Sequence, residues 1–261
     1  MSVEGESARR HFRALLEYRG ADFAGWQLQP NQRTVQGELE RALETLCREP
    51  IRVYGSGRTD SGVHARGQVA TFRSRTELGT ERLLRGINGL TGDDMSAWAL
   101  DEAPEDFHPQ YSARGKVYVY RLLLRRSASP LLAASTWHVP YGDLDVERLQ
   151  AELKSILGEA DWGGYRASDC GASTTVKTLR RAAVRPEGHG VLALEFEGSG
   201  FLKQMVRILV GTAVDVGRGK LEEGAMLRIR AAGDRTLAGR TAPAHGLCLE
   251  QVIYPPSGSS D

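Results

Sequence analysis

Apolar residues recur along this chain with two different periods, and the short connections between the two kinds of segment constrain the fold most. Alternation with period two, as in residues 11–18, is typical of a strand with one buried face. Spacings of three and four, as at Val35, Leu39 and Leu43 behind Thr34 as N-cap, predict an amphipathic helix. The connections are too short and irregular for a doubly wound parallel sheet. We therefore expect an α+β fold with mostly antiparallel mixed sheets flanked by helices.

The two patterns extend through both halves of the chain. Strands are expected at 11–18, near 51–54, and at 68–73, 95–100, 116–125, 177–185, 190–197 and 247–254. Further helices are expected after Thr80 as N-cap and at 145–157, 201–216 and 221–232. The segment 101–113 has two prolines and little periodicity. A boundary there gives an N-terminal domain at 8–106, a C-terminal domain at 107–255 and a disordered tail at 256–261.

Composition narrows the class of protein. Apolar residues make up 41% and charged residues 26%, as in ordinary water-soluble domains. No apolar run approaches the roughly 18 residues that span a bilayer. The first ten residues lack the apolar stretch of a signal peptide, so we expect a cytoplasmic protein without a membrane partner. Cys47, Cys170 and Cys248 are far apart, which argues against a disulfide framework and against a zinc site.

The formal net charge of +1 conceals local imbalance. Residues 107–126 contain five basic residues and no acid, and residues 55–75 contain four arginines against the single acid Asp60. Such stretches suit contact with the phosphates of a nucleic acid. Solvation of strands and loops explains them equally well, so both interpretations stay open at this point.

A glycine-rich segment at 55–68, GSGRTDSGVHARGQ, concentrates the candidate chemistry. Glycine permits positive φ and a close approach of the backbone to a ligand. Asp60 beside Arg58 is favoured in its charged form, as suits a nucleophile or general base. A tight turn fixed by an Asp–Arg ion pair would leave the same pattern. The segment lacks the Gly-Lys-Ser/Thr ending of a phosphate-binding loop and the GxGxxG spacing of a dinucleotide-binding loop. Asp60 and His64 have no further metal ligands nearby in sequence.

Five segments in order resemble the TruA-type bacterial tRNA pseudouridine synthases. Residues 57–65 are similar to that family's signature GRTDxGVHA. The others are 23–43, similar to GWQxQP…TVQ…LExAL, 108–122, similar to FHARFSAxxKxYxY, 198–212, similar to FLxxMVRxxVG, and 241–249, similar to APAxGLxL. The resemblance covers nearly the whole chain, and its ordered matches are far more specific than the loop alone.

The resemblance implies an isomerase without metal or other cofactor, which converts uridine to pseudouridine at positions 38, 39 and 40 of the tRNA anticodon stem-loop. It also implies a homodimer and a catalytic cleft between the two domains. Asp60 matches the catalytic aspartate, which attacks either ribose C1′ or base C6. Tyr118 matches the active-site tyrosine, whose ring stacks on the flipped-out base. Arg207 matches the arginine that pairs with the aspartate, and an arginine in so apolar a helix would independently require a carboxylate partner.

Other residues are expected at the substrate. The resemblance implies that Arg58 holds the flipped-out nucleotide and that Leu247 packs beside it. His64, Arg66 and Gln68 are expected either to support the loop or to touch RNA. On their own patterns, Tyr118 and Leu247 would be strand-core residues. The alternative for Arg207 is a solvent-facing arginine at the helix edge.

Three segments depart from the family pattern. Pro109 and Gln110 replace Ala-Arg, Gly92 replaces a proline in 88–98, and 161–179 has Trp162 where the family has phenylalanine. These changes are expected to affect how tightly RNA binds and which RNA substrates are accepted. Three other functions stay open: the same chemistry on a different RNA, an RNA-binding module without turnover, and an unrelated hydrolase with a metal at Asp60 and His64.

Overall fold

The computed structural model describes residues 9–140, 142 and 144–256, and these form two compact units. The first is Met1–Ala113 with Tyr254–Asp261, and the second is Arg114–Ile253. Both contain strands and helices, and the described strand pairs within each unit are antiparallel except one short parallel pair. The predicted α+β class is therefore confirmed. Of the tail predicted at 256–261, only Pro256 lies within the described residues.

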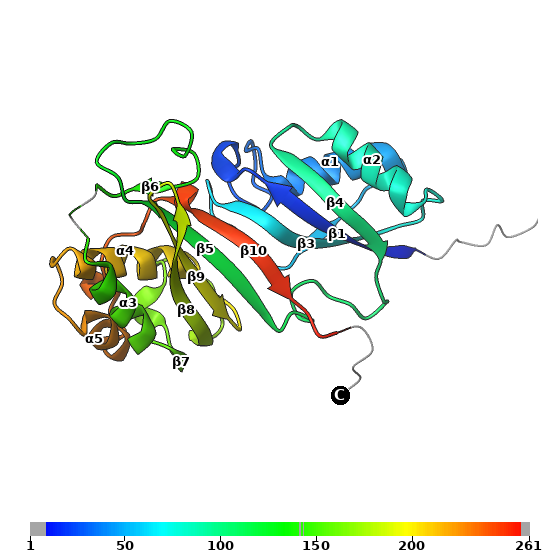
Figure 1. The fold of residues 1–261 in the computed structure, drawn as a ribbon. Coiled ribbons are helices and arrows are strands. Elements are labelled where there is room, and N and C mark those ends of the chain that lie inside the picture. The colour runs from blue at the N-terminus through cyan, green and yellow to red at the C-terminus, as the bar shows by residue number, and fades with distance from the viewer. Residues whose placement is uncertain (1–8, 141, 143, 257–261) are drawn as a thin grey trace, which may run out of the picture. The chain divides into compact units, whose positions relative to one another are not determined.

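The first unit is a small antiparallel sheet covered by two helices on one face (Figure 1). Its strands run in the order β4, β1, β3, with β2 also paired to β3. Their bounds are β1 Arg10–Tyr18, β2 Val53–Gly55, β3 His64–Ser74 and β4 Met95–Glu102. The helices are α1 (Val35–Cys47) and α2 (Thr80–Leu90). Phe12, Ala14 and Leu16 are fully buried on one face of β1, whereas Arg13 and Leu15 on the opposite face are partly exposed.

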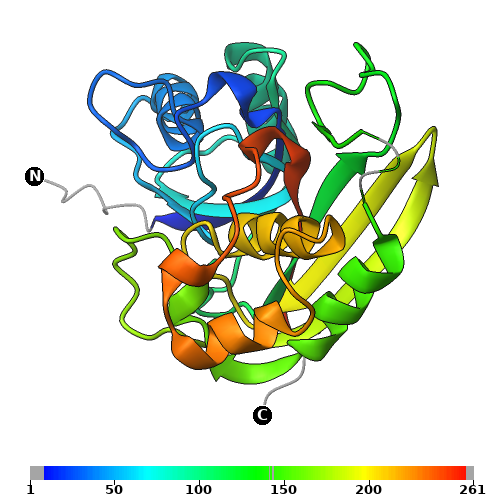
Figure 2. The same ribbon diagram turned by 90° about the vertical axis from the view of Figure 1, so that its left-hand side faces the viewer.

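The second unit has a five-stranded sheet in the order β10, β5, β9, β8, β7. The bounds are β5 Gly115–Leu123, β7 Gly158–Asp161, β8 Val176–Gly188, β9 Val191–Gly198 and β10 Leu247–Ile253, and β6 (Trp137–His138) pairs in parallel with β5. Three helices lie together on one side of this sheet: α3 (Val146–Ser155), α4 (Met205–Gly217) and α5 (Ala225–Ala232) (Figure 2). Short 3-10 turns occupy Gly20–Asp22, Gly163–Tyr165, Arg235–Leu237 and Ala244–Gly246.

Helix α4 is the core helix of the second unit. Every one of its residues is buried except Arg207, which is partly exposed. Gly211 lies against the crossing segment 240–242, and a Cβ on Gly211 would stand 1.7 Å from the carbonyl oxygen of Arg240. Only glycine permits this approach, so the residue fixes how the chain passes over the helix before it enters β10.

Several predicted boundaries are wrong, each for a local reason. The helix predicted at 201–216 begins at Met205, because Gln204 has φ +60° and breaks the helical conformation. The helix predicted at 221–232 begins at Ala225, because Gly224 has φ +74°. Gly79, not Thr80, occupies the N-cap position of α2, and Thr80 is its first residue.

One predicted helix cap is confirmed, and two short strands were not predicted. Thr34 caps α1 as predicted, with its Oγ1 accepting from the N–H of Gly37 at 3.2 Å. Strands β6 and β7 were not expected, because runs of two and four residues are too short to show alternation. Among the described helices, none has both the length and the apolar character needed to cross a membrane.

We expect two glycine-to-alanine changes, each within a helix, to act in opposite directions. Gly211→Ala should lower the free energy of unfolding by about 1–3 kcal/mol, because the new methyl group overlaps Arg240. Gly89→Ala in α2 meets nothing within 4 Å and should raise it by roughly 0.4–1 kcal/mol through backbone entropy. Urea unfolding of both variants measures this. Equal effects would contradict the close approach at Gly211.

Candidate active site

Asp60 lies in the loop between β2 and β3, and the backbone on both sides of it is anchored to residues 23–26. The N–H of Trp26 donates to the carbonyl of Thr59 at 3.1 Å. The carbonyl of Phe23 accepts from the N–H of Gly62 at 3.4 Å and from the Ser61 hydroxyl at 3.2 Å. We call these contacts the loop clamp. They fix the backbone of Asp60, whose side chain is partly buried.

Gly25 allows residues 23–26 to pack directly against the backbone of the Asp60 loop. Its φ is +95°, and a Cβ there would lie 2.7 Å from the Thr59 carbonyl oxygen and 3.2 Å from the carbonyl carbon of Asp60. Any side chain would therefore push Asp60 away or tilt it. The N–H of Val63 closes the turn by donating to the Asp60 carbonyl at 3.1 Å.

A buried polar network lies beneath the loop. The hydroxyls of Tyr18 and Thr59 are 2.8 Å apart and hydrogen bonded. The Gln68 side chain is fully buried; its Oε1 accepts from Ser56 Oγ at 2.6 Å and its Nε2 donates to the Gly57 carbonyl at 3.0 Å. Of the two roles expected for Gln68, the structure therefore provides loop support, while a direct contact with RNA conflicts with its burial.

The other expected loop residues differ in exposure. His64 Nδ1 accepts from the N–H of Gly20 at 3.1 Å, so this histidine also supports the start of β3. Arg66 exposes its side chain, and its carbonyl accepts from Trp98 Nε1 at 3.3 Å. Arg58 is exposed, and among the described residues it has no hydrogen bond or ion pair. The Asp–Arg ion pair that could have fixed the turn is thus not made with Arg58.

In the second unit, Tyr118 and Leu247 share one face of the sheet. Tyr118 on β5 pairs with Phe196 and Leu249, and Leu247 pairs with Tyr120 two residues further along β5. Opposed residues of antiparallel strands point to the same face, so Tyr118 and Leu247 are diagonal neighbours. Tyr118 is 8% exposed and Leu247 5% exposed, which leaves only an edge of each side chain for a ligand.

The ring of Tyr118 is held by a second aromatic residue. Phe201 meets it edge to face, with ring centroids 5.2 Å apart and an interplanar angle of 86°. Lys116 precedes Tyr118 by two residues and shares its face of β5, and burial lowers the pKa of Lys116 to about 8. Lys116 therefore titrates closer to neutral pH than an exposed lysine does.

Arg207 is oriented by the segment that precedes β10. Its Nε donates to the carbonyl of Ala242 at 2.8 Å, and the N–H of Ala242 donates to the carbonyl of Arg207 at 3.0 Å. The charge of Arg207 also reaches Tyr120: burial raises the pKa of Tyr120, and Arg207 offsets part of that rise. Arg207 is therefore a held, half-buried cation and not a solvent-facing residue of a helix edge.

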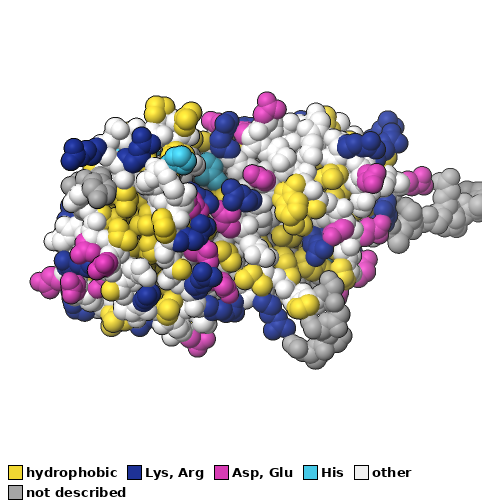
Figure 3. All heavy atoms as spheres, in the orientation of Figure 1, with side chains coloured by type: hydrophobic (Ala, Val, Ile, Leu, Met, Phe, Trp, Pro, Cys, Tyr) yellow, Lys and Arg dark blue, Asp and Glu magenta, His cyan; other side chains and the backbone are white. Residues whose placement is uncertain are grey.

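The two arginine-rich stretches are not uniform blocks of positive charge. Arg73 pairs with Glu105, and Arg121 lies between Glu187 at 2.7 Å and Glu250 at 3.1 Å. On the face seen in Figure 3, basic and acidic side chains are interspersed. No group of three or more His, Cys, Asp or Glu side chains within the described part of the chain is arranged to hold a metal ion.

Sequence patterns missed the residues that hold the site. Phe23, Gly25 and Trp26 support the Asp60 loop, and Phe201 and Ala242 support Tyr118 and Arg207. All five lie inside the segments whose resemblance to a family was noted, at 23–43, 198–212 and 241–249. Their place inside these segments was the only sequence feature that could have indicated them, because their contacts join residues far apart in sequence.

Comparison with known proteins identifies the family of the chain. Residues 14–112 and 153–255 match a family model described as tRNA pseudouridine synthase. A tRNA pseudouridine synthase A of Geotalea uraniireducens (strain Rf4) is 42% identical over 245 residues, which are 94% of this chain and 100% of that protein. The protein of the same name from Latilactobacillus sakei subsp. sakei (strain 23K) is 43% identical over 94% of this chain and 99% of its own length.

A further relative and a solved structure extend the comparison. The tRNA pseudouridine synthase A of Myxococcus xanthus is 40% identical over 94% of this chain and 95% of its own. A solved chain of a Cbf5-Nop10-Gar1 complex aligns with 77% of this chain and 54% of its own length, at 12% identity and a TM-score of 0.34, and adds nothing to the assignment. The family match and the full-length relatives settle it: the chain belongs to the tRNA pseudouridine synthase family, and it is an isomerase of the tRNA pseudouridine synthase A type.

Proposed function

We propose that this enzyme isomerises uridine to pseudouridine at positions 38, 39 and 40 of the tRNA anticodon stem-loop, with Asp60 as nucleophile. The observation that carries the proposal is the loop clamp, which anchors the backbone on both sides of Asp60. A carboxylate held in advance needs no reordering when the substrate arrives, and such positioning is a large part of enzymatic rate enhancement.

The reaction requires one bond exchange and one proton exchange. The N1–C1′ glycosidic bond breaks, the uracil turns, and C5 bonds to C1′; C5 loses its hydrogen to solvent and N1 gains a proton. No electrons are gained or lost. Attack of Asp60 on C1′ and attack on C6 both lead to this product. In each case the carboxylate must be ionised and within bonding distance of the nucleotide.

The remaining roles follow the resemblance and suit the side chains. Tyr118 would stack on the flipped-out base, and the edge contact with Phe201 supports a fixed ring plane. Arg207 would pair with Asp60, for which its orientation by Ala242 is a suitable preparation. Arg58 would hold the flipped-out nucleotide, as an exposed arginine can. Leu247 would pack beside that nucleotide.

The proposal also includes a homodimer and a cytoplasmic setting, which the family resemblance implies. Sedimentation of the purified protein checks the dimer.

Two alternative functions are separated by mapping the modified uridines and by measuring tRNA binding. Turnover at uridines outside positions 38–40 would indicate a different RNA target, and tRNA binding without turnover would indicate a binding module.

The first prediction from this proposed function concerns Asp60. The wild-type protein should release tritium from tRNA labelled at uracil C5, with chelator present and no cofactor added, because the C5–H bond breaks in the reaction. Asp60→Asn should bind the same tRNA and release only background tritium, because the amide is a poor nucleophile. Equal release by both proteins would remove Asp60 as the catalyst.

The second prediction concerns Tyr118. The Tyr118 hydroxyl would also help to remove the proton from C5. Tyr118→Phe keeps the ring against Phe201, so tRNA affinity should hold while the single-turnover rate falls by about 10²–10⁴-fold, as for loss of a proton-transfer group. Tyr118→Leu should also lose about 1–3 kcal/mol of binding free energy, as expected without base stacking. Filter binding and rapid quench measure the two quantities. A Phe variant as fast as wild type would exclude a role for the hydroxyl.

The third prediction concerns salt. If Arg58 and neighbouring cations meet phosphates, tRNA affinity should fall at least about tenfold between roughly 50 and 200 mM monovalent salt, since two or more contacts would release counterions. Titrations at four salt concentrations give the slope. An affinity independent of salt would contradict a phosphate-binding surface.

A further inference from the structure

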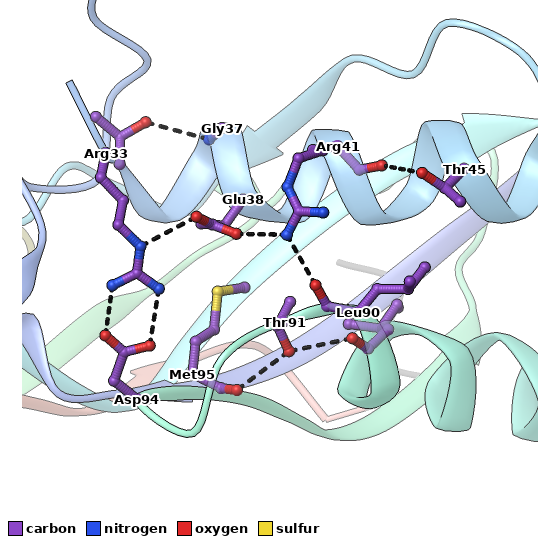
Figure 4. Close-up of polar contacts among 11 residues, drawn as sticks. Arg33, Gly37, Glu38, Arg41, Thr45, Leu90, Thr91, Asp94 and Met95 are labelled. Carbon is purple, nitrogen blue, oxygen red and sulfur yellow. Dashed lines mark hydrogen bonds and ion pairs between the residues drawn. The ribbon is translucent and has the colours of Figure 1, made fainter. Parts of the chain in front are cut away.

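The Arg33 side chain pairs with two carboxylates of the first unit, those of Glu38 and Asp94 (Figure 4). Its Nη1 donates to Asp94 Oδ2 at 2.6 Å and its Nη2 to Asp94 Oδ1 at 2.9 Å, while Nε donates to Glu38 Oε1 at 3.0 Å. Glu38 belongs to α1, and Asp94 directly precedes β4. All three guanidinium nitrogens are engaged, so the plane of the group is fixed.

The fixed guanidinium covers the ring of Phe23. Its Cζ lies 4.3 Å from the ring centroid, and Phe23 is only 2% exposed. The same ring meets Tyr18 edge-on at 6.2 Å, and the Tyr18 hydroxyl is bonded to Thr59. The Phe23 carbonyl accepts from Ser61 and Gly62. Phe23 therefore acts on both neighbours of Asp60, and Arg33 fixes Phe23.

The backbone around Arg33 holds the same segment. The carbonyl of Arg33 accepts from the N–H of Ala24 at 2.8 Å, and the N–H of Val35 donates to the carbonyl of Gly25 at 3.2 Å. The Arg33 side chain on Phe23 and the backbone groups of Arg33 and Val35 thus hold residues 23–25 together.

The charges of this network persist at the pH of an assay. Hydrogen bonds from Arg33 hold the pKa of Asp94 below its ordinary value. Burial alone would raise the pKa of Glu38, but hydrogen bonds from Arg41 and Arg33 bring it below the ordinary value. Both carboxylates are therefore ionised near neutral pH, and the pairs with Arg33 are complete there.

We propose that Arg33 is a positioning residue for the isomerisation: by fixing Phe23 it sets the place of the 59–62 backbone, and so of the Asp60 carboxylate. The inference rests on the proposed role of Asp60. A displacement of about 1 Å at a reacting group can cost roughly a hundredfold in rate. Loss of Arg33 should therefore slow the chemical step and leave tRNA affinity unchanged.

Arg41 supplies a matched control. It also pairs with Glu38, at 2.7 Å, and it donates to the carbonyl of Leu90 at 2.8 Å (Figure 4). Arg41 thus shares the Glu38 carboxylate with Arg33 and lies on the same helix as Glu38. Among the described residues, its recorded partners do not include Phe23 or the Asp60 loop. A general role in stability would make Arg41 and Arg33 equivalent, whereas positioning would not.

The test compares Arg33→Lys, Arg33→Met and Arg41→Met with wild type and Asp60→Asn. Thermal unfolding, tRNA affinity and the single-turnover rate of tritium release are measured for each. We expect Arg33→Met to lose about ten- to a hundredfold in rate, with affinity within about twofold. Arg33→Lys keeps the positive charge but loses the planar guanidinium, so its rate should lie between those of wild type and Arg33→Met. Arg41→Met should keep the wild-type rate even if its melting temperature drops as far.

Three results would overturn the proposal. They are an unchanged rate in both Arg33 variants, equal losses of rate in the Arg33 and Arg41 variants, and weaker tRNA binding with a normal rate at saturation. Should Arg33→Met fail to fold, Asp94→Asn removes the charge of the bidentate partner with little change of shape and is judged by the same criteria. If wild type releases no tritium, or Asp60→Asn matches it, the proposed function fails instead.

Discussion

The clamp between residues 23–26 and 59–62 is the interaction on which the candidate site of the first unit depends. It joins two loops that are far apart in sequence by backbone bonds from Trp26 and Gly62, and Gly25 permits the contact because it has no side chain. The polar groups beneath the loop are satisfied by Tyr18 and Gln68, so the loop is supported from below as well as from the side. A loop with so many fixed contacts can present one carboxylate in one place, as the proposed role of Asp60 as nucleophile requires.

In the second unit, as in the first, a glycine allows two backbone segments to pack closely beside a candidate site residue. A glycine, Gly211, admits the backbone of 240–242 against α4, and reciprocal bonds between Arg207 and Ala242 then orient the one partly exposed residue of that helix. Tyr118 is held in turn by its strand partners and by Phe201. In both units a close backbone approach fixes the main chain, and the fixed main chain positions the candidate site side chain. This arrangement fixes both side chains and leaves a small exposed edge on Tyr118 and on Leu247.

The fold class and most elements could be predicted from sequence, because alternation and helical spacing are local properties. Thr34 as a cap and the apolar α4 are examples. The features that could not be predicted depend on unusual backbone conformations or on contacts between residues far apart in sequence. A positive φ at Gln204, a residue without glycine's freedom, left no trace in the pattern. Glu152 accepts from Gly224 and from Met226 at the start of α5, and this capping across a long stretch of chain was equally invisible. In the site, the motif indicated Asp60, but the roles of Phe23, Gly25 and Arg33 depend on contacts that only the fold creates.

Amide hydrogen exchange tests the clamp most directly, because its bonds are backbone bonds. The N–H groups of Trp26 and Gly62 are the donors to the Thr59 and Phe23 carbonyls. We predict that both exchange as slowly as amides in the middle of β3, and that Gly25→Ala accelerates both while tritium release from labelled tRNA falls. Fast exchange at these two amides in a fully active wild-type enzyme would contradict the account, since Asp60 would then work from a loop that is not held.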